Sequence, residues 1–549
     1  MPVGLLALVA FAGGVLVGRN HGADERAAAG QYVRDWSRSD WAGMYALLDP
    51  ASRRAIGEPA FVAGYRRAAQ TATLSAIAAG RVAGLNHGVV DVAVAARTRL
   101  FGTLHAALAV PVSSDSSGAH VHFAASLVFP GLHLGEHLSR RAAMPPRAAL
   151  LASDGTPLAQ GPNRSSPIPD VAGAIAGVLG PIPAAQASLY AGLGYPPRTR
   201  VGLDGLERIF QVRLAGTPGG TLLAGRRVLA QVAPRPAPDL RTTIVPSLER
   251  AVTGAIAGRY AGIVALDPRS GAVLAAAGVA FSGLQPPGST MKIVTVTGAL
   301  AGGVTHIDDT YPVATQAIID GFALQNANGE ACGGRLIDAF AVSCNSVFAP
   351  LGVREGAARF LATAQHYGFN DPSPIATEPE STIPPKSLTR DDLELGASAI
   401  GQGQVQATTL EMADVAATIA MGGRRPVPTL VAGAPPRFVP VTSPGVAADV
   451  QRMMVAVVNS AEGTGTSAAI PGVIVAGKTG TAELRTTVAT PNNPNASSNP
   501  ANTDSWFVGY APVGAARIVV GALFPGQGAG AQTAAPAARL VLEAGLSGG

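Results

Sequence analysis

Hydrophobic and polar positions in the second half of the chain form two strand-like groups with helical periodicity between them. Strand patterns occur at residues 260–278, 472–483, 504–513 and 516–526, a helical pattern closes the chain at 533–546, and residues 290–460 are mostly helical in pattern. The first strand group turns back around Asp267–Gly271 and predicts a hairpin. Because the strand groups bracket the helical segment, we expect one sheet assembled from both ends, with helices packed against it.

The first half of the chain alternates helical and strand-like patterns, and it predicts a small α+β domain over residues 26–140. Residues 27–49 predict one amphipathic core helix, because aromatic and apolar side chains recur at approximate helical spacing. These side chains are Tyr32, Trp36, Trp41, Tyr45 and Leu48. Residues 88–112 and 118–129 predict paired strands. Residues 141–240 are rich in proline and glycine, so we expect an irregular linking domain that ends in a hinge at 231–241.

The N-terminus begins with an apolar run, residues 1–18, followed by Arg19. Its length is at the short limit for a membrane span, and it also suits the apolar region of a signal peptide. No lysine or arginine precedes the run, so its orientation is poorly determined. We expect residues 1–25 to contain an uncleaved anchor, with the remainder of the chain outside the cytoplasm.

Composition narrows the class of protein. A chain of 549 residues is too long for one ordinary core, so several domains are expected. A hydrophobic content of 47% with 14% charged residues excludes a largely disordered chain. The net charge of +5 is mildly basic, and the arginines are scattered, so the sequence has no footprint of nucleic-acid binding.

The two cysteines, Cys332 and Cys344, lie close together in the sequence. They form either one disulfide, in an oxidising compartment, or two free thiols, and the spacing alone leaves both open. No Cys/His spacing typical of a zinc site is present in the sequence.

Lysine is rare in this chain, and its placement points to chemistry. Only three of the 40 basic Lys and Arg residues are lysines, namely Lys292, Lys386 and Lys478. Lys292 follows Ser289 by three residues in a predicted helix, so the amine and the hydroxyl share one face. A serine hydroxyl needs a base to become a nucleophile, and a buried lysine with a lowered pKa can be that base. Arginine keeps its proton in proteins and cannot replace it.

Two further motifs follow in an informative order. Lys478, Thr479, Gly480 and Thr481 come at the end of a predicted strand, where a cation and hydroxyls suit a substrate carboxylate. Between the two lysines lies Ser343-Cys344-Asn345. The order Ser-x-x-Lys, Ser-x-Asn, Lys-Thr-Gly is the motif set of penicillin-binding proteins and class A β-lactamases.

On these three motifs the chain resembles a penicillin-binding protein, a serine D,D-transpeptidase of peptidoglycan synthesis. The stretches 399–413 and 505–512 are also similar to family sequences, and the resemblance covers about residues 241–549. The front of the chain resembles class B members that carry an NTF2-like N-terminal domain and a linking pedestal, whose entry is similar to residues 145–159. No Glu-Asp-x-x-Phe glycosyltransferase signature is present, which disfavours a bifunctional class A enzyme.

The resemblance implies a multidomain α+β architecture. It assigns residues 1–25 to the anchor, 26–140 to the NTF2-like domain, and 141–240 to the pedestal, a dimerisation-type linking domain. Residues 241–549 are assigned to the transpeptidase domain. This domain is expected to have the penicillin-binding or β-lactamase-like fold, an antiparallel sheet flanked by helices with a helical subdomain.

The resemblance also implies a catalytic set. Ser289 attacks the carbonyl between two D-alanines of a stem peptide, and Lys292 is the general base. Ser343 relays the proton to the leaving D-alanine, and Asn345 orients the substrate and Lys292. The backbone N–H groups of Ser289 and Thr481 form the oxyanion hole.

Substrate binding is implied for the third motif. Lys478 belongs with the catalytic residues, and Thr479, Gly480 and Thr481 hold the terminal carboxylate with it. Penicillins acylate Ser289 by mimicking D-Ala-D-Ala, and no metal or organic cofactor is needed. The implied partners are peptidoglycan stem peptides, β-lactam inhibitors, the bacterial membrane through the N-terminus, and proteins of a cell-wall synthesis complex, with the catalytic domain on the extracytoplasmic side.

Three other interpretations compete with this one. His133–His137 matches the His-x-x-Glu-His pattern of a zinc peptidase, but Pro130, Gly131 and Gly135 argue against the helix that this chemistry needs. A serine β-lactamase needs a deacylating base, and the sequence has no Glu-x-x-Leu-Asn stretch. A non-catalytic β-lactam sensor or division scaffold usually has a signalling domain or a lost motif residue, and neither is visible.

Overall fold

The computed structural model describes residues 22–484 and 502–547, so the predicted anchor over residues 1–25 lies almost wholly outside the described residues. The chain divides into two compact units. In the described part, the first unit comprises residues 22–148, 179–201 and 212–238, and the second comprises 149–178, 202–211, 239–484 and 502–547. No helix in the described ranges has the length and apolar character to cross a bilayer.

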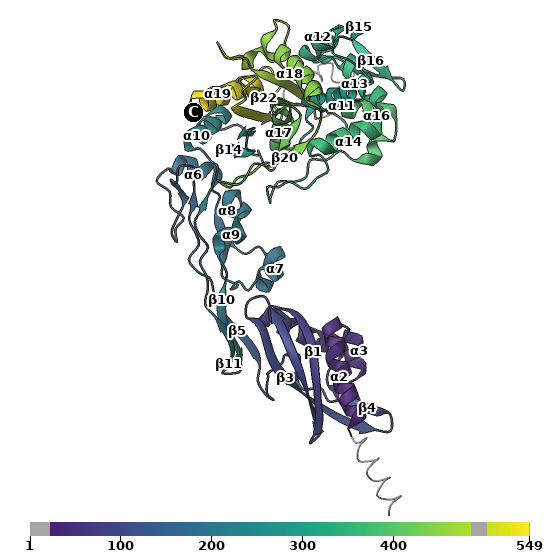
Figure 1. Cartoon of the computed structure of the whole chain (residues 1–549), viewed down its shortest axis with the longest axis vertical. Coiled ribbons are helices and arrows are strands. Elements are labelled where there is room, and N and C mark those ends of the chain that lie inside the picture. The colour runs from purple at the N-terminus through teal and green to yellow at the C-terminus, as the bar shows by residue number, and fades with distance from the viewer. Residues whose placement is uncertain (1–21, 485–501, 548–549) are drawn as a thin grey trace, which may run out of the picture. The chain divides into compact units, whose positions relative to one another are not determined.

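The first unit has a four-stranded antiparallel sheet in the order β1-β2-β3-β4 and a three-stranded sheet in the order β11-β10-β5. Helix α2 packs along the first of these sheets (Figure 1). The helices of the first unit are α2 (Ala23–Arg38), α3 (Trp41–Ala46), α4 (Pro50–Ala55), α5 (Glu58–Ala72) and α7 (Ala187–Gly192). Its strands are β1 (Leu74–Asn86), β2 (Val89–Thr98), β3 (Gly102–Asp115), β4 (Gly118–Val121), β5 (Leu138–Ala143), β8 (Leu179–Pro181), β10 (Gly219–Ala224) and β11 (Arg227–Val232). Two short elements, β9 (Arg200–Gly202) and α9 (Gln211–Ala215), have residues in both units.

The prediction of one helix over residues 27–49 is wrong. Helix α2 ends at Arg38, because Ser39 adopts a left-handed conformation with φ of 60°. The side chain of Asp40 then accepts a hydrogen bond from Gly43 N at 2.9 Å and caps the new helix α3. The aromatic side chains still meet in one core, where the rings of Trp36 and Tyr65 lie 5.0 Å apart.

The strand predictions for the first unit are partly confirmed. Residues 88–112 form β2 and most of β3, as expected. The segment 118–129 is a strand only to Val121, and Ala125–Val128 is a 3₁₀ turn. The long strand β1 was not predicted, because most of its side chains are exposed and its alanines and glycines give weak alternation.

The second unit is built on a five-stranded antiparallel sheet in the order β14-β13-β23-β22-β21. Its strands are β13 (Gly262–Asp267), β14 (Ala272–Gly278), β21 (Ala476–Glu483), β22 (Thr503–Ala511) and β23 (Ile518–Phe524). The sheet therefore joins strands from both ends of the predicted domain, which confirms the expected hairpin and the expected assembly. Strand β21 lies at one edge of the sheet.

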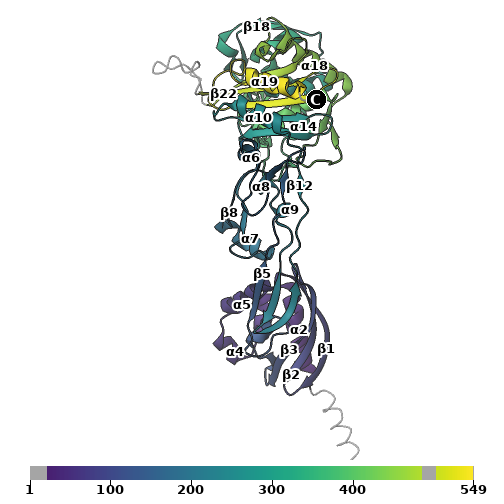
Figure 2. The ribbon, with the colours of Figure 1, turned by 90° about the vertical axis from the view of Figure 1, so that its left-hand side faces the viewer.

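Helices cover both faces of this sheet. Helices α10 (Pro246–Ile256) and α19 (Ala534–Ser547) pack together on one face (Figure 2). Helices α17 (Thr409–Ala420) and α18 (Pro444–Asn459) pack on the other. Beyond them lie α11 (Lys292–Ala301), α12 (Leu336–Ala341), α13 (Asn345–Glu355), α14 (Ala357–Tyr367), α15 (Pro385–Leu388) and α16 (Asp392–Ala399). The segment 290–460 is thus largely helical, as predicted.

Short strands interrupt this helical material, which the periodicity did not predict. Strand β15 (Thr310–Ala314) pairs with β18 (Cys332–Arg335), and β16 (Gln316–Ile319) pairs with β17 (Phe322–Gln325). The remaining elements of the second unit are β6 (Leu150–Leu151), β7 (Pro157–Ala159), α6 (Pro169–Ile175), α8 (Gly205–Ile209), β12 (Leu240–Arg241), β19 (Arg424–Pro426) and β20 (Phe438–Pro440). The linking segment is therefore less irregular than expected, because many of its short apolar runs pair as strands.

Candidate active site

The first and third motifs meet where the chain enters α11 beside the edge strand β21. Gly288 precedes Ser289 with φ of 53°, and a Cβ built on it would lie 3.0 Å from the backbone carbonyl of Thr481. A Cβ on Gly480 would lie 2.8 Å from the carbonyl oxygen of Pro287. Both glycines are needed because only a residue without a side chain lets these two backbone segments come so close.

Lys292 is the first residue of α11, and its side chain is fully buried. Its Nζ donates to Ser343 O at 2.6 Å and to Asn345 Oδ1 at 2.6 Å, and it lies 3.2 Å from Ser343 Oγ. No acidic side chain is among these contacts. Burial, together with the nearby cation of Lys478, holds the pKa of Lys292 well below its usual range.

A neutral Lys292 can keep its two shortest hydrogen bonds and still have a free lone pair. A neutral amine has two N–H donors and one lone pair. The two short bonds to Ser343 O and Asn345 Oδ1 use both donors. The lone pair is then available to accept a proton from a hydroxyl group.

Lys478 lies on β21 and is also fully buried. Its Nζ donates to Ser343 Oγ at 2.8 Å and to Thr479 O at 3.1 Å. Burial lowers the pKa of Lys478 to about 7. Burial lowers the pKa of both amines, and the charge of Lys478 lowers that of Lys292 further, so we assign the proton of the pair to Lys478, the amine suited to attract an anion.

Ser343 joins the two lysines. It occupies the turn between α12 and α13, with an unusual positive φ of 64°. Its Oγ lies within hydrogen-bond distance of both Lys292 Nζ and Lys478 Nζ, at 3.2 and 2.8 Å. A hydroxyl placed between a proton acceptor and a cation can pass a proton from one side to the other.

Ser289 and the two threonines are neighbours in the chain of the two lysines in this cluster. Ser289 lies in the 3₁₀ turn η3 (Gly288–Met291), half-buried and one turn before Lys292. Thr479 is buried, and its Oγ1 lies 2.6 Å from Thr464 Oγ1. Thr481 is exposed, and its Oγ1 accepts a hydrogen bond from Gly530 N at 3.3 Å. The structure thus brings all the predicted residues of the three motifs to one place.

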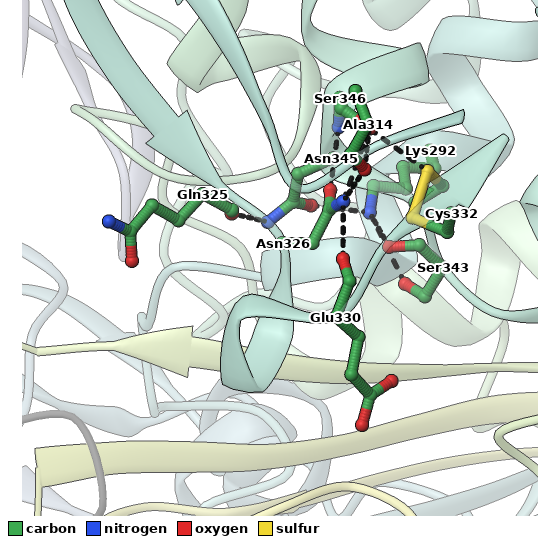
Figure 3. Close-up of a disulfide and its surroundings, with 10 residues drawn as sticks. Lys292, Ala314, Gln325, Asn326, Glu330, Cys332, Ser343, Asn345 and Ser346 are labelled. Atoms are coloured by element: carbon green, nitrogen blue, oxygen red, sulfur yellow. Dashed lines mark hydrogen bonds between the residues drawn. A yellow bond between two sulfur atoms is a disulfide. The ribbon is translucent and has the colours of Figure 1, made fainter. Parts of the chain in front are cut away.

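The cysteines form a disulfide, which the sequence left open. Cys332 on β18 is bonded to Cys344, with Cα atoms 5.7 Å apart. Figure 3 shows this bond beside Lys292, Ser343 and Asn345. Cys344, the middle residue of the second motif, is therefore bonded to strand β18, through a cysteine 12 residues earlier in the chain.

Some site residues have no signal in the sequence. Asn326 is buried and accepts a hydrogen bond from Ser346 N at 2.8 Å, and Asn345 Nδ2 donates to Gln325 O at 2.8 Å. Thr464 holds Thr479 from the loop after α18. A single polar residue in an irregular segment has no periodicity, so only the fold shows that these side chains reach the site.

The His-x-x-Glu-His segment does not form a helix. Residues 133–137 are turns and irregular backbone, and Glu136 pairs with Arg227 at 2.7 Å. The two histidines are therefore not presented on one helical face, as zinc-peptidase chemistry needs. Throughout the described part of the chain, no group of three or more His, Cys, Asp or Glu side chains is arranged to hold a metal ion.

Comparison with protein families gives a match that spans the second unit's sheet and helices. The family model described as the penicillin binding protein transpeptidase domain matches residues 261–543. The peptidoglycan D,D-transpeptidase PbpA of Mycobacterium tuberculosis is 34% identical over 296 residues, which cover 49% of this chain and 56% of that protein. The peptidoglycan D,D-transpeptidase MrdA of Haemophilus influenzae is 26% identical over 64% of this chain and 63% of that protein. The chain thus spans less than two thirds of the length of these curated relatives.

A solved structure gives a similar result. Penicillin-binding protein A from M. tuberculosis, in its penicillin G acyl-enzyme complex, matches with a TM-score of 0.58 and 27% sequence identity. The match covers 73% of this chain and 99% of that chain.

Proposed function

Because the chain belongs to the penicillin-binding protein transpeptidase family, we propose that it is a peptidoglycan D,D-transpeptidase that β-lactams acylate at Ser289. The observation that carries this proposal is the buried lysine pair around one hydroxyl. Lys292 is fully buried with no acidic side chain among its contacts, and Lys292 and Lys478 both contact Ser343 Oγ, at 3.2 and 2.8 Å. The hydroxyl of Ser343 therefore lies between a base, Lys292, and a cation, Lys478.

The first half of the proposed reaction forms an acyl-enzyme. Ser289 Oγ attacks the carbonyl carbon between the two D-alanines while its proton passes to Lys292 Nζ. The negative charge that develops on the carbonyl oxygen is stabilised by the backbone N–H groups of Ser289 and Thr481. The close approach of Gly288 to Thr481 supports this role, because it brings the two backbone segments together.

Collapse of this intermediate needs a proton on the leaving amine. Ser343 Oγ is proposed to carry that proton, which its contacts with Lys292 and Lys478 support. The D-alanine leaves as a neutral amine, and Ser289 keeps the acyl group as an ester. An amine from a neighbouring stem peptide then attacks the ester carbonyl, with Lys292 again accepting a proton, and the new amide bond forms the cross-link.

Substrate orientation is assigned to the third motif and to Asn345. The terminal carboxylate is proposed to bind the Lys478 cation and the hydroxyls of Thr479 and Thr481, while Gly480 lets β21 lie against Pro287. Asn345 is proposed to hold the substrate amide while its Oδ1 keeps Lys292 in place, as the 2.6 Å hydrogen bond supports.

The rest of the chain is given the roles that its resemblance implies. Residues 26–140 are proposed to be an NTF2-like domain, 141–240 a pedestal, and 241–549 the transpeptidase domain. Residues 1–25 are proposed to anchor the protein in the bacterial membrane, with the catalytic domain on the extracytoplasmic side. Proteins of a cell-wall synthesis complex are proposed partners.

A cross-linking assay tests the activity. The full chain is incubated with a synthetic stem peptide ending in D-Ala-D-Ala and an acceptor amine, and released D-alanine and joined product are measured. We expect equal amounts of both, inhibition by penicillin, and no product with a matched peptide ending in D-Ala-L-Ala. Rapid release of hydrolysed penicillin, without joined product, would contradict the proposal and favour a β-lactamase.

A further inference from the structure

The turn that carries Ser343 closes the end of helix α12. Ser343 has φ of 64°, the left-handed conformation common just after a helix end, and the backbone N–H groups of Ser343 and Cys344 donate to Phe340 O and Ala339 O. Yet both the hydroxyl and the carbonyl of Ser343 contact Lys292, and Asn345 contacts the same amine. The position of this turn therefore decides the surroundings of the proposed base.

The segment that contains β15 to β18 holds the turn through several contacts, such as the hydrogen bond from Asn345 Nδ2 to Gln325 O, and two of them use the buried side chains of Cys344 and Asn326. The first is the disulfide from Cys344 to Cys332 on β18. The second is the side chain of Asn326, which accepts a hydrogen bond from Ser346 N and donates to Ala314 O, both at 2.8 Å. Figure 3 shows the disulfide and this amide close to Asn345 and Lys292.

Neither contact is explained by acyl transfer itself. The sulfur of Cys344 is bonded toward β18, and its side chain is 1% exposed, so it does not face the substrate. Asn326 is 4% exposed, and its side-chain amide forms hydrogen bonds with backbone groups, including Glu330 O at 2.8 Å. These residues touch only the turn and the strands, which makes them positioning residues.

We infer that residues 310–335 act as a clamp on the Ser343–Ser346 turn, with the Cys332–Cys344 disulfide and Asn326 as its two fastenings, and that reduction of the disulfide slows acylation. A reductant can break the disulfide, whereas the hydrogen bonds of Asn326 do not depend on redox conditions. This inference rests on the proposed function, since it concerns the rate at which Ser289 is acylated.

The redox step is balanced by an external thiol or phosphine. A dithiol supplies two electrons and two protons, the S–S bond breaks to two thiols, and the dithiol becomes a disulfide. A phosphine supplies the same two electrons and becomes a phosphine oxide with an oxygen from water, while two protons complete the thiols. Oxidation of the two thiols by a disulfide reagent reverses the change.

The loosened turn has a specific consequence for Lys292. Water that enters beside Ser343 and Asn345 weakens the desolvation of the buried amine, so its pKa rises toward its ordinary value. A smaller fraction of Lys292 is then neutral at a given pH, and the acidic limb of the acylation rate moves to higher pH. A disulfide that only stabilised the fold would leave that limb in place.

The test measures acylation of the full chain by fluorescent penicillin, before and after reduction with a phosphine that mass spectrometry shows to be complete. We expect the acylation rate constant to fall about 10- to 100-fold, the acidic limb to move to higher pH, and reoxidation to restore both. The Cys332→Ser/Cys344→Ser variant should behave like the reduced protein and ignore the phosphine. If that variant fails to fold, the reduced natural chain still gives the answer.

Asn326→Ala tests the second fastening against a matched control. Asn370 has the same kind of bonds, to Ile383 N and O at 2.9 Å, and it takes no part in the site. We expect Asn326→Ala to slow acylation and Asn370→Ala to lower only the melting temperature.

The outcomes separate the two claims. Unchanged acylation after complete reduction overturns the inference, and so does global unfolding at the assay temperature, because the disulfide would then serve stability alone. Absence of labelling in the oxidised natural chain contradicts the proposed function instead.

Discussion

Lys292 Nζ donates to Asn345 Oδ1 at 2.6 Å, although the two residues are 53 positions apart in the sequence. Together with Ser343 O, this oxygen occupies both N–H donors of a neutral amine. A third donor, which only a charged lysine has, would face the 3.2 Å contact to Ser343 Oγ. It is burial and the nearby charge of Lys478, which lower the pKa of Lys292, that favour the neutral form able to accept a proton.

Replacing Lys292 by arginine should be as damaging as replacing it by alanine. Arginine keeps its charge in this buried site, so it cannot accept the proton of Ser289. Loss of a general base typically slows a reaction about 10²- to 10⁴-fold. The acylation rate constant with fluorescent penicillin is the measurement. Substantial activity in Lys292→Arg would remove the general-base role.

Acylation should depend on pH with two opposed limbs. The rate rises as pH increases through the pKa of Lys292, because burial lowers that pKa and the neutral amine is the active form. It falls again as Lys478 loses its proton near pH 7 in the free protein, because the carboxylate then loses its cation. The acylation rate constant at low penicillin concentration checks this shape.

Saturating penicillin should move the basic limb. A bound carboxylate stabilises the charged form of Lys478, so its pKa rises in the complex. The limb should therefore lie at higher pH at saturation than at low concentration. A rate that keeps rising to pH 10 under both conditions would show that Lys478 does not bind the anion.

Lys478→Met should weaken binding more than it slows the chemical step. A hydrogen bond between charged groups is worth about 1.5–3 kcal/mol, so the concentration for half-saturation should rise about 10- to 100-fold. A penicillin methyl ester lacks the negative charge and serves as the matched ligand. Equal losses for the acid and the ester would contradict an anion-binding role for this amine.

Gly480→Ala should displace β21 from the entrance of α11. Its Cβ would lie 2.8 Å from Pro287 O and 2.9 Å from Trp506 Cβ, so something must shift. Overpacking of this kind costs about 1–3 kcal/mol, and acylation should fall with it. The melting temperature and the acylation rate constant are the two measurements.

Gly254→Ala is the control for that substitution. Gly254 lies inside α10, where a Cβ has no atom within 4 Å. Alanine in a helix interior is about 0.5–1 kcal/mol more favourable than glycine, so stability should rise slightly and acylation should not change. Similar behaviour of the two alanine variants would mean that the close approach at Gly480 has no functional weight.

The sequence predicted the sheet of the second unit well, because its strands are strongly patterned. Residues 260–278 and the three strands near the C-terminus have continuous apolar runs and clear turns, and they form the central sheet. The three motifs could also be predicted, because their residue types and their order along the chain are specific. The structure adds that Lys292 and Lys478 share one hydroxyl.

The errors occur where local geometry overrides periodicity. Helical spacing continues from Tyr32 to Leu48, but the left-handed Ser39 and the capping Asp40 divide the helix. Strand β1 has little alternation, since it exposes most of its side chains. Asn326 reaches Ser346, which is 20 residues further along the chain, and no periodic pattern in the sequence indicates that these two residues meet.

Labelling by fluorescent penicillin tests the central claim most directly. The natural chain, Ser289→Ala and the control Ser282→Ala, an exposed serine just ahead of the same turn, are labelled side by side. Peptide mapping by mass spectrometry then locates the adduct. The account predicts an adduct on Ser289 in the natural chain and in Ser282→Ala, and none in a folded Ser289→Ala protein. Covalent labelling that persists in Ser289→Ala would contradict it.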